Sequence, residues 1–161
     1  AYLPDYDSKY VDHWVNQYWD NRKNSWITID IDGSSVISGF DPFNMPEQSF
    51  CFSADAWINT RKGMFDADDF WNAKGDTGLI YIAWELFYDF HCLMNNEIIY
   101  PHHPTITMPD VFNRLTNQEL EEIDDLAEAL RKPDENFSIL GEIWRSNKKF
   151  RLLKGMLLYN S

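Results

Sequence analysis

The segment from Leu79 to Asn95 constrains the fold more than any other part of the chain. It is apolar on nearly every side when placed on a helix, and such a helix is stable only where neighbouring elements cover it. With 161 residues, of which 44% are hydrophobic and 16% aromatic, the chain is long enough to form one core that supplies this cover. We therefore expect a single globular domain over residues 1–161, packed around a buried central helix at about 79–95.

The chain before residue 25 has the hydrophobic spacing of a helix. Apolar residues recur at i, i+3, i+4 and i+7, which is typical of one buried helical stripe. The residues of this stripe are Val11, Trp14, Val15 and Tyr18. With Asp7 as its cap, the pattern predicts an N-terminal helix that ends near Asn24.

From Trp26 the hydrophobic period changes to two. Isoleucines alternate with polar residues through position 31, Asp32 and Gly33 supply a turn, and apolar residues resume at 36–37. The pattern predicts a small antiparallel β-hairpin, with residues 49–52 as a third strand.

The rest of the chain is mostly helical in pattern. Thr116 and Glu119 have the spacing of a capping box, which predicts a helix running to Lys132. Further helical segments are expected after Ser53, after Asp66, from Pro109, and from Asn136 or Ser138 to Tyr159. Because strands and helices are segregated, the fold class is α+β: an N-terminal helix, a small hairpin or meander, and a mainly helical C-terminal two-thirds.

The charge of the chain limits its partners. It carries 26 acidic and 14 basic side chains, a formal net charge of −12. Such a field repels phosphate backbones and anionic lipids, so we expect neither direct nucleic-acid binding nor membrane binding, and a basic protein as the natural partner. Cys51 and Cys92 lie in apolar contexts that favour buried free thiols, and together with the absence of a long apolar segment they predict a soluble, cytoplasmic protein.

The acidic side chains gather in two clusters. One precedes Trp71; the other lies on the predicted helix after Thr116, where only Glu128 has a basic residue three or four positions further on. The like charges of that helix are therefore expected to stand uncompensated, either for solubility or as a binding surface. The candidate partner-binding residues are Asp66, Asp68, Asp69, Trp71, Glu121, Glu122, Asp124, Asp125 and Glu128.

In size and charge the chain resembles bacterial immunity proteins, small acidic cytoplasmic domains that neutralise nuclease toxins by covering a basic cleft. This resemblance implies a non-enzymatic inhibitor whose carboxylates and aromatic side chains contact the toxin. DNA-mimic inhibitors of nucleic-acid enzymes share the same profile and are an alternative. On either interpretation we expect charge reversal at Glu121, Asp124 and Glu128 to abolish binding without unfolding the domain.

A different function follows from the sequence Ile29-Asp30-Ile31-Asp32-Gly33, which is similar to the D-x-D-G signature of the haloacid dehalogenase phosphatases. That resemblance implies a Mg²⁺-dependent phosphohydrolase, with Asp30 as nucleophile and Asp32 as general acid and base on a buried parallel strand. The alternating strand pattern instead favours a hairpin turn at this place. The four histidines have no recognised ligand spacing, so we predict no metal site and no cofactor.

Overall fold

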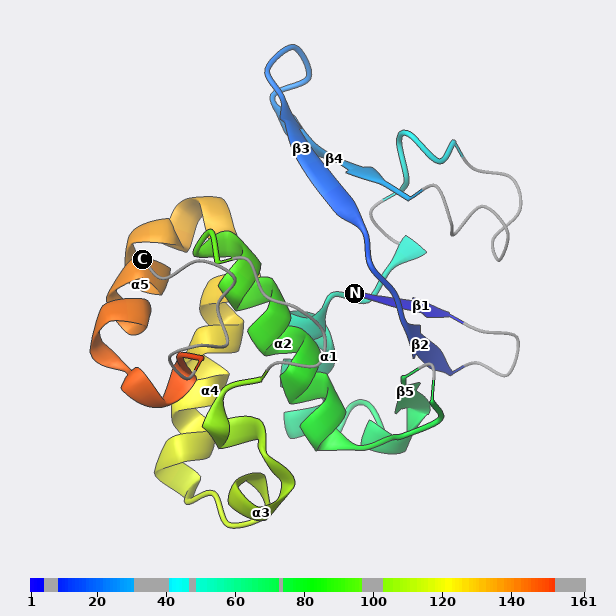
Figure 1. The fold of residues 1–161 in the computed structure, drawn as a ribbon. Helices are drawn as coiled ribbons and strands as arrows, with labels where there is room; N and C mark the ends of the chain where they lie inside the picture. The colour runs from blue at the N-terminus through cyan, green and yellow to red at the C-terminus, as the bar shows by residue number, and fades with distance from the viewer. Residues whose placement is uncertain (5–8, 31–40, 47–48, 73, 97–102, 153–161) are drawn as a thin grey trace.

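The computed structural model describes residues 1–4, 9–30, 41–46, 49–72, 74–96 and 103–152. Its first four strands precede the helices, and a short fifth strand lies between the first two α-helices (Figure 1). The strands are β1 (Tyr2–Pro4), β2 (Tyr10–Asp12), β3 (Asn16–Asp20), β4 (Ser25–Ile29) and β5 (Phe70–Trp71). The α-helices are α1 (Ser53–Arg61), α2 (Leu79–Leu93), α3 (Pro109–Phe112), α4 (Asn117–Leu130) and α5 (Pro133–Ser146). Three short 3₁₀ helices are η3 (Ala67–Asp69), η4 (Thr105–Thr107) and η5 (Lys148–Phe150). The mixed α+β class is confirmed.

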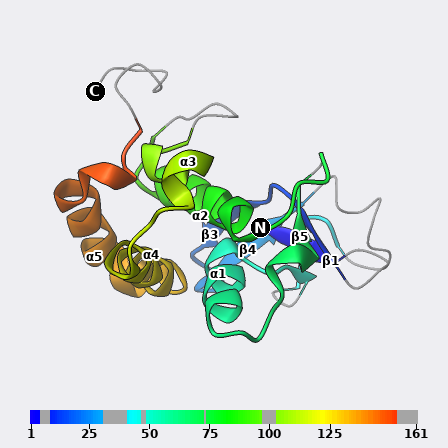
Figure 2. The same cartoon turned by 90° about the horizontal axis from the view of Figure 1, so that it is seen from below.

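The predicted central helix is present as α2. Its middle is buried by α1 and α4, and α5 packs on the other side of α4 (Figure 2). Trp57 of α1, Phe87 of α2 and Leu126 of α4 meet in the main core, each with at most 1% of its surface exposed. The apolar circumference of this segment therefore predicted its position correctly. Among the described helices, none is long and apolar enough to cross a membrane.

The predicted N-terminal helix is wrong, because the described part of this region forms the strands β2 and β3. Trp14 and Tyr18 are 55% and 46% exposed, so they do not form a buried stripe. Trp19 instead faces Trp26 across the β3–β4 hairpin, with an edge-to-face ring contact at 5.7 Å. Aromatic pairs of this kind favour strands over an isolated helix.

The hairpin that contains β4 also differs from the predicted one. β4 pairs with the preceding strand β3 in antiparallel register, and the predicted partner at 36–37 lies outside the described residues. The connecting turn is stabilised by Asp20, whose carboxylate accepts hydrogen bonds from the backbone N–H of Arg22 and Lys23, and by Asn24 at φ +49°. In the second sheet β2 lies between β1 (antiparallel) and β5 (parallel). The predicted third strand at 49–52 is only a bridge between Cys51 and Tyr2.

The helix starts predicted at Pro109 and Thr116 are confirmed, and those predicted at Ser53, at Asp66 and at Asn136 or Ser138 differ. Thr116 and Glu119 form the predicted capping box of α4, which ends two residues before the predicted Lys132. Asp66 caps η3 rather than an α-helix, and the chain continues into β5. Ser53 begins α1, but its hydroxyl donates to Asp89 of α2 instead of capping its own helix. The last helix starts early, at Pro133, and a break follows it at Asn147.

Candidate partner-binding surface

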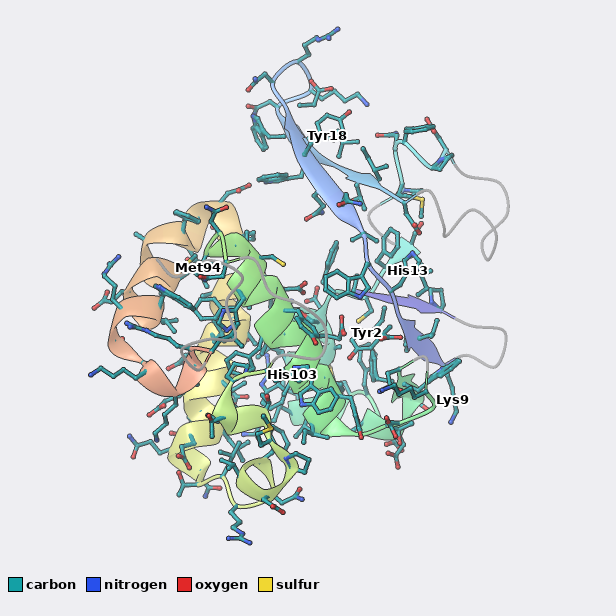
Figure 3. All side chains as sticks on the ribbon, viewed as in Figure 1. Tyr2, Lys9, His13, Tyr18, Met94 and His103 are labelled. Carbon is teal, nitrogen blue, oxygen red and sulfur yellow. The ribbon has the colours of Figure 1, made fainter. Side chains whose placement is uncertain are left out.

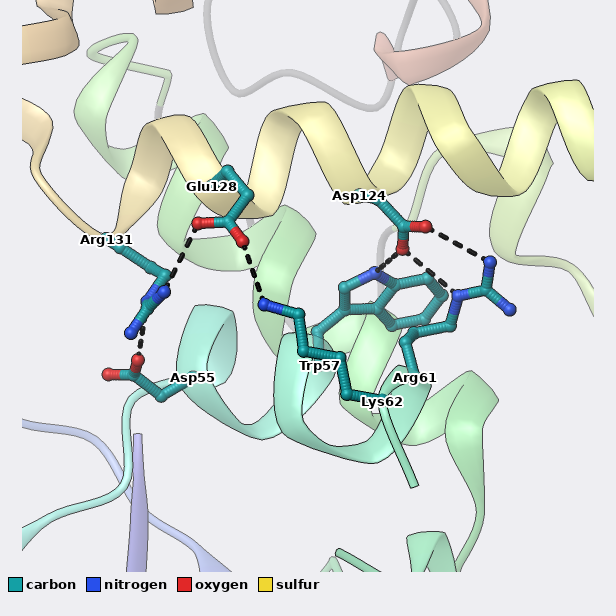
Figure 4. Close-up of polar contacts among 7 residues, drawn as sticks. All are labelled: Asp55, Trp57, Arg61, Lys62, Asp124, Glu128 and Arg131. Atoms are coloured by element: carbon teal, nitrogen blue, oxygen red, sulfur yellow. Dashed lines mark hydrogen bonds and ion pairs between the residues drawn. The ribbon is translucent and has the colours of Figure 1, made fainter. Parts of the chain in front are cut away.

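Asp124 connects α4 to α1. One oxygen of its carboxylate accepts a hydrogen bond from the indole N–H of Trp57 at 2.7 Å, and both oxygens bind the guanidinium of Arg61 at 3.1 Å (Figure 4). The Trp57 side chain is fully buried, so Asp124 satisfies a donor that has no access to water. The hydrogen bond with Asp124 raises the pKa of Arg61.

Glu128 takes part in a second set of contacts between the same two helices. Its carboxylate pairs with Lys62 at 3.4 Å and with Arg131 at 3.2 Å, and Arg131 also binds Asp55 of α1 at 2.8 Å (Figure 4). These side chains are between about 39% and 57% exposed, and exposed pairs contribute about 0 to 1 kcal/mol each. These ion pairs help to orient α4 on α1 but add little to the free energy of unfolding.

Two further carboxylates of α4 bind the basic C-terminal part of the chain. Glu119 pairs with Lys149 at 2.8 Å, and Glu122 accepts a hydrogen bond from the amide of Asn147 at 2.9 Å. The hydrogen bond from Lys149 is the main reason that the pKa of Glu119 falls to about 2. The expectation that the charges of this helix stand uncompensated is therefore wrong for Asp124, while Glu122 has a neutral hydrogen-bond partner. Glu128, which the sequence already paired with Arg131, also pairs with Lys62 of the α1 C-terminus.

Glu121 and Asp125 differ from the other acidic residues of α4. Both are exposed, both lie on the outer face one turn apart, and neither makes a hydrogen bond or ion pair with the described residues. Arg61 is near enough for Glu121 to contribute to its raised pKa, after the larger effect of Asp124. Like charges at i and i+4 destabilise a helix slightly. On α4, these two carboxylates can meet a partner without losing a contact to the described residues.

Part of the second acidic cluster makes hydrogen bonds within its own loop. The Asp66 carboxylate accepts a hydrogen bond from the backbone N–H of Asp68, and the Asp68 carboxylate accepts one from the hydroxyl of Thr77 at 3.0 Å. Asp66 and Asp68 are exposed, whereas Asp69 and Trp71 are half-buried. This cluster lies at the strand side of the molecule, and α4 lies on the opposite side of α1 (Figures 1 and 2). The structure does not bring the two predicted clusters together.

Asp30 lies in a setting unlike the one that the phosphatase resemblance implies. It follows an antiparallel hairpin strand rather than a strand of a parallel sheet, and its carboxylate is buried 2.9 Å from the Nε2 of His13. Asp32 lies outside the described residues. Within the described part of the chain, no three His, Cys, Asp or Glu side chains gather in a way that could hold a metal ion.

Sequence reasoning missed a small cavity between α2 and the strands. Its walls are four aromatic rings, two carboxylates and one amide, from Tyr2, Tyr81, Trp84, Tyr88, Asp12, Glu85 and Asn72. Glu85 is 7% exposed, and burial raises its pKa to about 7, with smaller contributions of the same sign from Asp89 and Asp12. Glu85, one of two carboxylates in the largely apolar segment of α2, was the sequence signal for this site.

Comparison with known proteins adds no relative. No protein-family model, no curated protein and no solved structure matches this chain.

Proposed function

We propose that the chain is a non-enzymatic binding protein that covers a basic surface of a protein partner, as an inhibitor of a nuclease-type toxin would. The observation that supports it most directly is the pair Glu121 and Asp125 on α4, exposed and without an ion pair among the described residues. Carboxylates that already bind Arg61, Lys62 or Lys149 are engaged in contacts within the chain. The pair on the outer face is the part available to a cationic partner.

The net charge of −12 supports the same proposal at longer range. A negative domain attracts a basic partner before contact and speeds association, an effect that salt screens over about 10 Å. The interface itself then depends on local pairs and buried side chains rather than on total charge. The binding rate is accordingly expected to fall steeply with ionic strength, while dissociation changes less.

The test begins with capture of partners from cell extract on the immobilised chain, followed by reconstitution of the complex from purified components. The decisive comparison is between two doubly substituted chains of equal net charge, Glu121→Lys/Asp125→Lys and Asp110→Lys/Glu142→Lys. Asp110 and Glu142 are exposed acidic residues on α3 and α5, away from the outer face of α4. The α4 variant is expected to lose at least about tenfold in affinity, since two contact pairs are removed. The control variant is expected to lose only the long-range electrostatic attraction, which both variants lose equally.

A reconstituted complex that is indifferent to salt contradicts the proposal, as does equal loss of affinity in the two variants. Recovery of no basic protein contradicts it as well. The second cluster is tested separately with Asp66→Asn and Asp69→Lys, because it lies on another part of the surface. A larger effect there would move the binding surface to the η3 segment and leave the class of partner unchanged.

A further inference from the structure

We infer that the outer edge of β3 is a dimerisation surface, at which the β3 strands of two copies of this chain pair in antiparallel register. The hairpin of β3 and β4, which we call the arm (residues 16–29), projects from the body of the molecule (Figure 1). Its two strands contact each other extensively and no other described element to a comparable degree. The arm reaches the body at the start of α5, through Trp26 and Asp134, and not at the outer face of α4. The inference therefore goes beyond the proposed function, and the failure of one leaves the other untouched.

The backbone hydrogen bonds of β4 show which groups of β3 point outward. The carbonyl of Thr28 accepts the N–H of Met45 at 3.0 Å, so the backbone groups of Thr28 point away from β3. Thr28 is paired with Gln17, and Trp26 with Trp19, which makes these the non-hydrogen-bonded pairs of the hairpin. The N–H and C=O groups of Gln17 and Trp19 therefore face outward, and no described residue bonds them.

The strand β3 has none of the features that keep an exposed edge from pairing with another chain. Its sequence, Asn-Gln-Tyr-Trp-Asp, contains no proline and no lysine, and its first four residues are exposed. Its register with β4 runs without a bulge. Tyr18, labelled in Figure 3, and Trp19 are 46% and 41% exposed and stand on opposite faces of the arm. An open edge of this kind is a template for a further strand.

The sequence of β3 favours a second copy of the same strand as the occupant. In an antiparallel pair centred on Tyr18, Gln17 of each copy lies opposite Trp19 of the other, and these residues exchange both N–H···O bonds. Asn16 then lies opposite Asp20 in a non-hydrogen-bonded pair, whose side chains are close together. One oxygen of Asp20 accepts the N–H groups of its own turn, and the other bonds no described residue. That second oxygen can accept a hydrogen bond from the Asn16 amide of the other copy, so the strand is complementary to itself.

The charge of the arm permits the close approach of two copies, although the whole chain carries −12. Residues 16–29 contain one carboxylate, Asp20, and two cations, Arg22 and Lys23, so the arm has a formal charge of +1. Repulsion between the acidic bodies is a longer-range effect, which salt screens over about 10 Å. We therefore expect dimerisation to strengthen with ionic strength, which is the opposite of the dependence expected for a basic partner.

The test is sedimentation equilibrium of the purified chain over a concentration series that reaches about 1 mM, because two paired short strands form a small interface. A reversible equilibrium between monomer and dimer is expected, with more dimer at high salt. Hydrogen exchange then locates the interface. The backbone amides of Gln17 and Trp19 are expected to exchange at least about tenfold more slowly in the concentrated chain than in the dilute one. The amide of Tyr18, which faces β4, is expected to change less.

Two substitutions of Gln17 separate the backbone from the side chain. Both Gln17→Pro and Gln17→Ala lose the side-chain hydrogen bond to Thr28 of the same hairpin, but only the proline also removes the outward N–H. Proline is tolerated on an edge strand where its nitrogen faces outward. Gln17→Pro is expected to weaken dimerisation at least about tenfold, and Gln17→Ala by about twofold or less.

A second pair of variants applies if Gln17→Pro does not fold. Asn16→Asp places a carboxylate opposite Asp20 of the other copy and is expected to weaken the dimer several-fold. Gln118→Glu, a change of equal charge at an exposed position of α4, is expected to leave the dimer intact.

Five results would overturn the inference. They are a monomer at every concentration, a dimer that salt dissociates, equal weakening by Gln17→Pro and Gln17→Ala, full dimerisation of the Asn16→Asp chain, and protected amides at Gln17 and Trp19 in the dilute monomer. The last result would show that the edge of β3 is covered from within its own chain.

Discussion

Replacement of Asp124 by alanine is expected to destabilise the domain by about 1 to 4 kcal/mol. The larger part comes from Trp57, whose buried indole N–H loses a charged acceptor 2.7 Å away, and an unsatisfied buried donor costs about 1 to 3 kcal/mol. The smaller part comes from Arg61: this pair is roughly 30% exposed on each side, and exposed ion pairs contribute about 0 to 1 kcal/mol.

Two further substitutions separate these contributions. Asp124→Asn keeps an oxygen that can accept the Trp57 N–H but removes the charge, so its cost is expected to be about 1 kcal/mol. Arg61→Ala removes only the exposed pair and is expected to cost about 1 kcal/mol or less. The free energy of unfolding is measured by urea denaturation of the three variants and the unchanged chain. The reasoning is refuted if Asp124→Ala and Asp124→Asn cost the same, or if Arg61→Ala costs as much as Asp124→Ala.

Two other predictions concern the buried histidine of α2 and the cap of α4. Burial lowers the pKa of His91 from 6.5 to about 4, so the unfolded chain binds its proton first and this contribution to stability, about 3 kcal/mol, is lost as pH falls from about 6.5 to 4. His91→Gln, which can still donate to the Phe150 carbonyl, should flatten that part of the unfolding profile; an unchanged acid profile would contradict the assignment. Thr116→Ala removes one half of the capping box and should cost about 1 kcal/mol in thermal unfolding. Thr116→Ser keeps the cap hydroxyl and is the matched control, and equal losses in both variants would exclude the cap as the cause.

The parts of the fold that the sequence predicted well are those governed by local rules. The circumference of α2 is apolar whatever packs on it, and the capping box of Thr116 and Glu119 is closed within four residues. The N-terminal helix failed because eight residues suit a helical stripe and a pair of strands equally. This region forms a strand because β3 pairs with β4, with Trp19 against Trp26, and because a turn at Asn24 connects the two. Such pairings are non-local and leave no fixed spacing in the sequence.

The ion pairs of the acidic helix α4 could not be predicted from the sequence for the same reason, because most of their partners come from other elements. Spacing at i+3 and i+4 finds only partners on the same helix, and by that rule α4 has one compensated carboxylate. The fold supplies Arg61 and Lys62 from the end of α1 and Lys149 from beyond α5, so three of the six carboxylates of α4 pair with cations of the same chain. A reversal at Asp124 or Glu128 would therefore confound lost binding with lost helix contacts. Among the carboxylates of α4, only Glu121 and Asp125 make no hydrogen bond or ion pair with the described residues, so substitutions there report on a partner without disturbing helix contacts.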